Sequence, residues 1–257
     1  MKFFVDTANI KEIEELIPTG FVDGVTTNPS LIAKNGDDMA KTIKTICSIV
    51  SGPVSAEVTA TDFDTMLQEG KYLASLAKNV AVKVPLTPNG LKTCKTLREK
   101  DIMVNVTLCF TAAQALLAAK AGATFISPFV GRLDDLGENG MDLIEDIVDI
   151  YENYNFKTEV LVASIRSAQH VIDAAVIGAH VSTLPPKVIH GLYNHELTDK
   201  GLSAFLEDWK KTWMAKDSPT MFISATEKEN FDSFRKLLYD TAKDIHAKRF
   251  PYNNYLY

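Results

Sequence analysis

The sequence has few cysteines and lacks any long run of apolar residues. Its three cysteines, Cys47, Cys94 and Cys109, are odd in number and do not show the spacing of a metal site. We therefore expect free thiols in a reducing compartment. No apolar stretch approaches the roughly 20 residues of a membrane-spanning helix, and the short apolar run at the N-terminus passes into acidic and polar residues, unlike a signal peptide. These features predict a cytoplasmic protein without a membrane partner.

The common signatures of cofactor and nucleic-acid binding are also absent. No glycine-rich dinucleotide loop follows the first predicted strand, and the net charge of −6 argues against a nucleic-acid partner. The five histidines show no metal-ligand motif and are typical of surface or structural positions: His170, His180, His190, His195 and His246. We expect neither a metal ion nor an organic cofactor.

Short β-branched segments alternate with longer amphipathic segments along most of the chain. The predicted strands are 2–7, 23–28, 54–59, 80–85, 104–110, 124–130, 159–166 and 180–185. Helical patterns such as 112–122 and 168–179 reach a glycine, Gly122 and Gly178, as a helix C-cap does. Eight strand–helix units in roughly 200 residues predict a closed (β/α)8 TIM barrel of the α/β class. An open doubly wound sheet is the structural alternative.

The chain beyond the eighth predicted strand differs from the rest. We expect a catalytic barrel domain with its C-terminal helix over 1–215, and an extension over 216–257 with one further helix and an irregular tail. The first of these helices carries an aromatic stripe: Leu202, Phe205, Leu206, Trp209 and Trp213. Such a stripe needs an apolar cover, either on its own barrel or on a neighbouring subunit. After a loop with Ser218 and Pro219, apolar spacing from Phe231 to Ile245 predicts the last helix, before the tail FPYNNYLY.

Alternation along the strands predicts which side chains enter the barrel, because successive side chains point to opposite faces. The residues that alternate with the inward ones are mostly apolar, as is expected of positions under covering helices. The predicted inward set is Phe4 and Asp6; Thr26 and Asn28; Ser55, Glu57 and Thr59; Ala81, Lys83 and Pro85; Asn105 and Thr107; Ser127 and Phe129; Ser164 and Arg166. Polar groups thus gather mainly toward the carboxyl ends of the strands, where barrel enzymes build their active sites.

Lys83 is the most informative of these inward residues. A lysine inside a barrel is costly unless it is paired or functional, and a neutral lysine amine can attack a ketone to form an iminium. The iminium withdraws electrons, so the adjacent carbon–carbon bond can break in a retro-aldol step. Asp6 and Glu57 lie on different strands and can divide the general acid and base roles. Thr107 could hold a water molecule between Glu57 and the iminium.

The remaining polar residues suit a phosphorylated sugar. Asn28, Asn105 and Ser127 can hydrogen-bond sugar hydroxyls, and Thr26 and Phe129 complete the wall of the predicted substrate site. Arg132 and Arg166 lie at or just beyond the sixth and seventh strands and could bind a phosphate in a charge-assisted manner. Ser164 and Ser167, near a helix start, could add donors to that site.

These residues lie in motifs that resemble those of the transaldolase family, in its short bacterial-type branch. The motifs are FFVDTANIKEIEE, GVTTNPSLIAK, SAEVT, VAVKVP, VNVTLCF, ISPFVGR, ASIRS and HELTDKGL, and the resemblance runs from about Met1 to Trp213. It implies a (β/α)8 barrel with Lys83 as the Schiff-base lysine, Asp6 as the base for the departing hydroxyl, and Glu57 and Thr107 around the catalytic water. It also implies sugar contacts at Asn28, Asn105 and Ser127, and phosphate contacts at Arg132, Ser164 and Arg166.

The resemblance further implies the transfer of a dihydroxyacetone unit between sugar phosphates in the pentose phosphate pathway. Fructose-6-phosphate aldolases of the same branch carry Gln where Glu57 stands and Tyr where Phe129 stands, so both positions favour transaldolase. That aldolase activity is one alternative, and a non-catalytic sugar-phosphate-binding barrel is another. Members of the branch form pentamers or decamers, which implies a homo-oligomer whose C-terminal helix reaches a neighbour. The stretch after about Lys216 departs from the family pattern and leaves the size of the assembly open.

Overall fold

The computed structural model of the chain describes residues 1–35, 38–214, 221, 223 and 230–249. The chain divides into two compact units, Met1–Asn194 and His195–Tyr257, and each is described by itself. The predicted domain boundary near residue 215, the loop with Ser218 and Pro219 and the tail FPYNNYLY lie outside the described residues.

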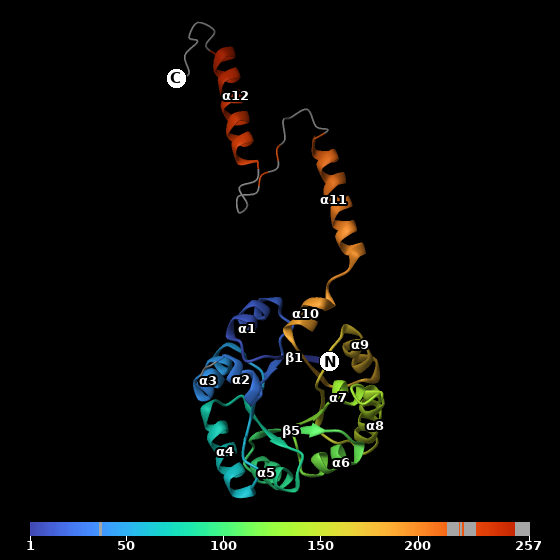
Figure 1. Cartoon of the computed structure of the whole chain (residues 1–257). Coiled ribbons are helices and arrows are strands. Elements are labelled where there is room, and N and C mark those ends of the chain that lie inside the picture. The colour runs from blue at the N-terminus through green and yellow to red at the C-terminus, as the bar shows by residue number, and fades with distance from the viewer. Residues whose placement is uncertain (36–37, 215–220, 222, 224–229, 250–257) are drawn as a thin grey trace. The chain divides into compact units, whose positions relative to one another are not determined.

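The first unit is a closed barrel of eight parallel strands in chain order (Figure 1). The strands are β1 (Lys2–Asp6), β2 (Gly24–Thr26), β3 (Val54–Glu57), β4 (Val80–Pro85), β5 (Met103–Cys109), β6 (Phe125–Pro128), β7 (Glu159–Val162) and β8 (Val181–Leu184). Closure comes from the pairing of β1 with β8, in which Phe4 lies opposite Thr183. The predicted (β/α)8 barrel is confirmed, and the open sheet is excluded because neither β1 nor β8 is an edge strand.

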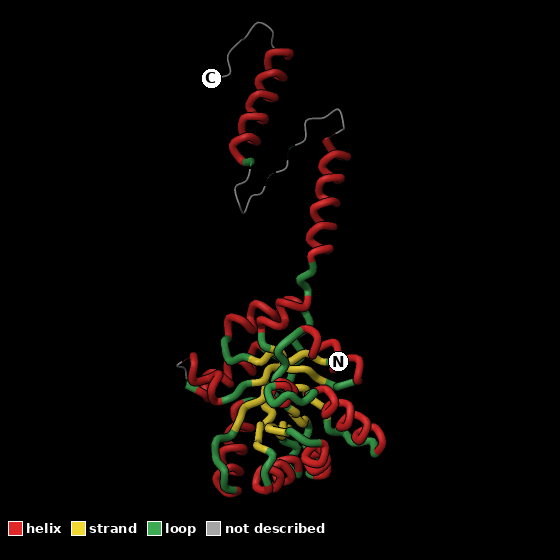
Figure 2. The backbone as a smooth tube through the Cα atoms, turned by 45° about the vertical axis from the view of Figure 1, so that its right-hand side comes forward, coloured by secondary structure: helices red, strands yellow, loops and turns green. Residues whose placement is uncertain are grey.

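Helices surround the strands and cover their outer face (Figure 2). They are α1 (Ile10–Leu16) with the 3-10 turn η1 (Ile17–Thr19), α2 (Pro29–Asn35), α3 (Met39–Ile49), α4 (Phe63–Leu76), α5 (Pro88–Arg98), α6 (Ala112–Lys120), α7 (Val130–Asp134), α8 (Gly140–Asn153), α9 (Ala168–Ile177) and α10 (Pro186–Leu192).

Local sequence explains where many of these helices begin and end. Side-chain oxygens accept a hydrogen bond from the first turn of α1, α3, α4, α5, α6, α8 and α9; the capping residues are Asn9, Asp38, Asp62, Thr87, Thr111, Asn139 and Ser167. Gly122 and Gly178 adopt φ values of 80° and 93° just after α6 and α9. Glycine tolerates this left-handed conformation, so both predicted stops are confirmed.

The alternation of the strands creates two apolar layers. The larger layer lies between the strands and the helices, and it includes Val5, Val82 and Val106. The smaller one fills the barrel below the polar residues and consists of Phe4, Ala81, Phe125, Leu161, Ala163 and Val181, with Met103 and Phe129 packed against it. Burial of each large side chain stabilises the fold by roughly 1.5–3 kcal/mol. The polar inward residues lie nearer the carboxyl ends of the strands.

The predicted alternation is wrong on the seventh strand. Leu161 and Ala163 pack inside the barrel, whereas Val160 and Val162 belong to the outer layer. β7 ends at Val162, and Ser164 then adopts φ 62°. Because this left-handed residue breaks the extended backbone, the parity of a strand no longer decides where Ser164 and Arg166 point.

The predicted inward position of Thr59 is also wrong. β3 ends at Glu57, and Thr59 is exposed beyond that end. Its backbone N–H and its hydroxyl donate to the carboxylate of Glu69 on α4. The hydrogen bonds to Glu69 therefore draw Thr59 toward the helix layer.

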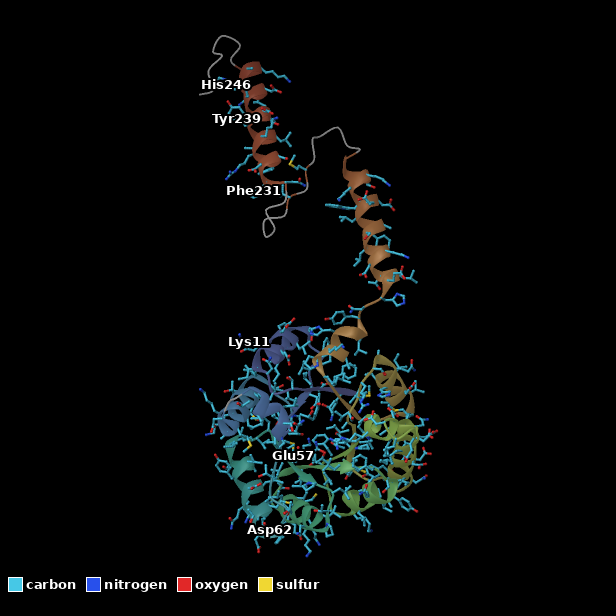
Figure 3. The ribbon with its side chains drawn as sticks, viewed as in Figure 1. Lys11, Glu57, Asp62, Phe231, Tyr239 and His246 are labelled. Atoms are coloured by element: carbon cyan, nitrogen blue, oxygen red, sulfur yellow. The ribbon has the colours of Figure 1, made fainter. Side chains whose placement is uncertain are left out.

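The second unit contains α11 (Glu196–Met214) and α12 (Phe231–Arg249), the additional C-terminal helices that the sequence predicts. In α11 the predicted stripe is exposed, with Leu202 63%, Phe205 73%, Leu206 48% and Trp209 45% accessible; the side chain of Trp213 lies outside the described residues. Figure 3 labels Phe231, Tyr239 and His246 along α12. No helix in the described ranges combines the length and apolar character that a membrane crossing requires.

Candidate active site

Two adjoining cavities open at the carboxyl ends of the barrel strands. The first, of about 190 Å³, is lined by Asp6, Thr26, Asn28, Lys83, Asn105, Ser127, Phe129, Arg132, Ala163, Ser164 and Thr183. The second, of about 320 Å³, is lined by Asn28, Pro29, Ser30, Glu57, Lys83, Thr107, Leu108, Phe129 and Arg132. Both include Lys83, so we treat them as the two lobes of one site around this lysine.

Lys83 forms a buried ion pair at the centre of the site. Glu57 and Lys83 are paired positions on β3 and β4, and Lys83 Nζ lies 3.0 Å from Oε2 of Glu57. Nζ also donates to the carbonyl oxygen of Thr27 at 3.4 Å. Only 7% of Lys83 is exposed, and Figure 3 shows Glu57 within the ring of strands, far from the peripheral Lys11 and Asp62. The amine is therefore held by Glu57 at the end of β3 and by Thr27 just beyond the end of β2.

Asp6 provides a second carboxylate on the other side of the first lobe. The hydroxyl of Thr26, its paired position on β2, donates to Asp6 Oδ1 at 2.8 Å. Burial raises the pKa of Asp6 above its ordinary range, while the hydrogen bond from Thr26 and the charge of Lys83 act against that rise. A carboxylate with a raised pKa is a stronger base once it is ionised.

Asn105 of β5 forms a polar network with Ser127 of β6 and Ser55 of β3. Ser127 Oγ donates to Asn105 Oδ1 at 2.7 Å, and Asn105 Nδ2 donates to Ser55 Oγ at 3.1 Å. All three residues are buried. These hydrogen bonds make Oδ1 of Asn105 an acceptor and Nδ2 a donor, which fixes the orientation of the amide. Asn105 and Ser127 both line the first lobe.

Phe129 and Arg132 form the wall that the two lobes share. The guanidinium of Arg132 lies over the Phe129 ring, 5.0 Å from its centroid, and Phe110 packs edge-on against the same ring at 5.9 Å. This stacking holds Arg132 toward the cavities, so one cation is available there for an anionic group.

Arg166 is placed differently from Arg132. It does not line either cavity, and its guanidinium forms a two-point ion pair with Asp135. This pair holds the pKa of Asp135 below its usual range and raises the pKa of Arg166. The structure therefore brings Ser164 into the first lobe but leaves Arg166 beside it, on an exposed carboxylate.

Gly131 allows α7 to approach the loop after β7. A Cβ at this position would lie 2.4 Å from the carbonyl oxygen of Ser164 and 2.7 Å from Nε of Arg166. Any larger residue would push apart the two segments that carry Arg132 and Ser164. The glycine of the motif ISPFVGR is thus explained by close packing.

Thr107 lies in the second lobe beside a distorted stretch of backbone. Its hydroxyl is buried and has no hydrogen-bond partner among the described residues. The next residue, Leu108, adopts φ 61°, and the β5–β6 register shifts between Val106 and Cys109. Such irregularities are common beside active sites, where they redirect side chains.

Sequence reasoning placed most of the lining residues but missed some. Thr183 lines the first lobe, and alternation from Val181 on β8 would have predicted it. Pro29, Ser30 and Leu108 also line the second lobe. Pro29 and Ser30 begin α2, and Leu108 lies in β5, where its φ of 61° interrupts the alternation. Asn28 serves a second purpose, because its side chain accepts from the N–H of Leu31 at the start of α2. In the part of the chain that the structure describes, no group of three or more potential ligand side chains could hold a metal ion.

A closed parallel barrel with a buried lysine–carboxylate pair at the carboxyl ends of its strands defines a (β/α)8-barrel enzyme. The family described as Transaldolase/Fructose-6-phosphate aldolase matches residues 3–239, and the chain belongs to this family. Proteins described as "Probable transaldolase" are similar to it. The one from Parvibaculum lavamentivorans is 65% identical over 82% of this chain and 98% of its own length. The one from Rhodospirillum centenum is 64% identical over 82% of this chain and 92% of its own. The protein is therefore an enzyme of the transaldolase family.

A solved structure shares the fold alone. The crystal structure of inosine 5'-monophosphate dehydrogenase from Legionella pneumophila matches with a TM-score of 0.51 and 17% identity, over 72% of this chain and 58% of that one. Its likeness carries no information about the reaction.

Proposed function

We propose that this protein is a transaldolase that transfers a dihydroxyacetone unit through a Schiff base on Lys83. The donor is a ketose phosphate, sedoheptulose 7-phosphate or fructose 6-phosphate, and the acceptor is an aldose phosphate, glyceraldehyde 3-phosphate or erythrose 4-phosphate. The observation that carries the proposal is the 3.0 Å contact between Lys83 Nζ and Glu57, inside a cavity that Asp6 lines from another strand. Family membership supports the same reaction.

The first step joins Lys83 to the ketone. The neutral amine adds to the carbonyl carbon, and the resulting carbinolamine loses its hydroxyl as water to form the iminium. Glu57 adjoins Nζ and can pass protons between the nitrogen and the departing oxygen. The buried hydroxyl of Thr107 can hold the water molecule that takes part, since that hydroxyl lines the same lobe.

The second step breaks the carbon–carbon bond of the donor. Asp6 removes the proton from the hydroxyl next to the scissile bond, and the bond electrons move into the iminium to give an enamine. The aldose phosphate leaves with its new carbonyl group. The raised pKa of Asp6 suits this task because the ionised carboxylate is then a better proton acceptor.

The third step reverses the second on a new aldehyde. The enamine carbon attacks the carbonyl of the acceptor, Asp6 returns its proton to the new hydroxyl, and hydrolysis of the iminium frees Lys83. Asn28, Asn105 and Ser127 are positioned in the first lobe to hydrogen-bond the hydroxyls of the three-carbon unit. We assign the phosphate to Arg132 and Ser164, with Arg166 joining them when it leaves Asp135.

Glu57 and Phe129 support transfer over release of free dihydroxyacetone. Both residues line the second lobe. A ring without a hydroxyl adds no proton donor to the region around the enamine, so the intermediate persists until an aldose arrives. We also propose that the enzyme works in the cytoplasm, in the pentose phosphate pathway, as a homo-oligomer of pentamer or decamer type. The exposed apolar stripe of α11 supports an assembly of some kind.

Two measurements test this function. Borohydride reduction with fructose 6-phosphate should trap an adduct on Lys83, detectable in the peptide that contains it, and Lys83→Met should abolish it. Lys2→Met is the matched control, because Lys2 pairs with Glu159 at the surface. The rate of ketose consumption should rise when erythrose 4-phosphate is added. An unmodified Lys83 would refute the Schiff base, and a rate unaffected by the aldose would favour the aldolase.

A further inference from the structure

The hydroxyl that contacts Asp6 is itself held by a residue from the last strand. Thr26 Oγ1 lies 2.8 Å from Asp6 Oδ1 and 2.5 Å from Thr183 Oγ1. Asp6 and Thr26 are paired on β1 and β2, whereas Thr183 belongs to β8. Both threonines are buried, with 3% and 4% of their surface exposed. The three side chains form a short chain of hydrogen bonds across the closure of the barrel.

The directions of these hydrogen bonds follow from the number of protons. An ionised carboxylate only accepts, and a threonine hydroxyl carries one proton. If Asp6 is ionised, Thr26 spends its proton on Asp6 Oδ1, and Thr183 must donate to Thr26. If Thr26 donated to Thr183 instead, lone pairs on Thr26 Oγ1 and Asp6 Oδ1 would face each other at 2.8 Å. With Asp6 ionised, Thr183 is therefore the donor in its hydrogen bond with Thr26.

We propose that Thr183 is a positioning residue that orients the Thr26 hydroxyl toward Asp6 and so favours the ionised form of this base. The inference rests on the proposed role of Asp6 in the reaction. Hydrogen bonds in a chain strengthen one another, and a bond to an ionised group is stronger than one to its neutral form. The loss of the Thr183 hydroxyl should therefore weaken the ionised form of Asp6 more than its protonated form.

The other charged side chains that line the first lobe with Asp6 are those of Lys83 and Arg132. Lys83, from β4, acts on it through its charge, and Lys83 is itself paired with Glu57 of β3. β2 and β8 contribute the uncharged Thr26 and Thr183. Two hydrogen bonds separate Thr183 from Asp6, and the contacts of Lys83 are with Glu57 and the carbonyl oxygen of Thr27. The Thr183 hydroxyl can therefore be removed without changing the partners of Lys83.

The test compares Thr183→Val, which keeps the shape but removes the hydroxyl, with Thr183→Ser, which keeps the hydroxyl. The side-chain carboxyl carbon of Asp6 is followed by ¹³C NMR as pH changes, and its resonance is assigned by its loss in Asp6→Asn. We expect Thr183→Val to raise the midpoint of the Asp6 titration by roughly half a pH unit, and Thr183→Ser to restore it. The acid limb of ketose cleavage should move in the same direction, since Asp6 must be ionised to accept a proton.

The outcomes separate this inference from the proposed function. An unchanged midpoint in a folded Thr183→Val protein would overturn the role of Thr183, even if transfer activity is normal. If Thr183→Val does not fold, Thr183→Ala with the same titration decides the question, and an unchanged midpoint there also overturns it. A shifted midpoint in a protein whose Lys83 is never trapped would keep the hydrogen-bond chain and refute the function.

Discussion

Lys83 and Glu57 occupy paired positions on neighbouring strands, and their side chains meet with Nζ 3.0 Å from Oε2. Lys83 is buried and Glu57 is partly buried, so each charge depends on the other for stabilisation. In-register pairing of β3 with β4 is what brings the carboxylate to the amine, and a shift of one residue would turn either side chain to the outer face. The reaction therefore depends directly on strand register.

Glu57→Gln should slow turnover by roughly 100-fold, since general acid–base catalysis typically contributes at least that much. The amide can still hydrogen-bond Lys83 but cannot carry a proton to the departing oxygen. The steady-state turnover rate and the rate at which borohydride traps the adduct on Lys83 should fall together. Glu159→Gln, which breaks the exposed pair with Lys2, is the control and should retain activity. Equal rates in Glu57→Gln and the native enzyme would exclude Glu57 from proton transfer.

Arg132→Lys should raise the KM for a ketose phosphate about tenfold, because lysine cannot reproduce the planar, two-point contact of a guanidinium. The stacking over Phe129 would also weaken. The KM for dihydroxyacetone, which has no phosphate, should change much less. Arg98→Lys serves as the control, since Arg98 binds the carbonyl oxygens of Ile102 and Gly122 outside both cavities. An equal loss for both substrates would contradict phosphate binding by Arg132.

Asp6→Asn should stabilise the fold while it abolishes cleavage. Burial raises the pKa of Asp6, so between its unfolded and folded pKa the folded state binds more protons, and the free energy of unfolding falls as pH rises. Removal of the charge should therefore raise the melting temperature more at pH 8 than at pH 5. At pH 8 we expect the free energy of unfolding to rise by about 1 kcal/mol, which corresponds to roughly 2–4 °C in melting temperature.

Asp135→Asn should change the melting temperature in the opposite direction to Asp6→Asn. Arg166 lowers the pKa of Asp135, so its ionised form stabilises the fold above the unfolded pKa and this contribution is lost as pH falls. We expect Asp135→Asn to melt slightly lower than the native enzyme at pH 8. Thermal melts of both variants at two pH values would measure the two signs, and a stabilising Asp135→Asn would contradict the ion pair.

Gly131→Ala should destabilise the protein by roughly 1–3 kcal/mol, as overpacking commonly does. The new Cβ would meet the Ser164 carbonyl oxygen at 2.4 Å, so the KM for phosphorylated substrates should rise as well. Chemical denaturation and kinetics measure the two effects. Gly191→Ala is the matched control because a Cβ there meets nothing within 4 Å. A Gly131→Ala enzyme with native stability would show that the close approach is not required.

Phe205→Lys should lower the mass of the protein in solution if the stripe of α11 forms the subunit contact. Phe205 is 73% exposed in the chain as described, and a charge there would oppose burial in an interface. Leu238→Lys, at 58% exposure in α12, is the matched control and should leave the mass unchanged. Light scattering after size-exclusion chromatography gives both masses. A drop for Leu238→Lys alone would place the contact in α12 instead.

Strand alternation predicted most of the site because it depends only on local backbone geometry. Asp6, Lys83, Asn105 and Ser127 line the cavities as that rule requires. The rule failed on β7, where Val160 and Val162 face outward, and Ser164 reaches the cavity because a φ of 62° interrupts the extended backbone there. No sequence pattern indicates this conformation, since serine seldom adopts it.

The sequence by itself determined the number and order of the barrel elements, the helix caps and the inward lysine with its two carboxylates. These features follow from periodicity and from hydrogen bonds between close neighbours in the chain, which are local properties. Only the tertiary structure decided that Arg166 meets Asp135, that Ser164 reaches the cavity, and that Thr183 contacts Thr26. Those contacts join residues that lie 31 and 157 positions apart in the first and last cases, and they exist because the barrel closes and brings its segments together.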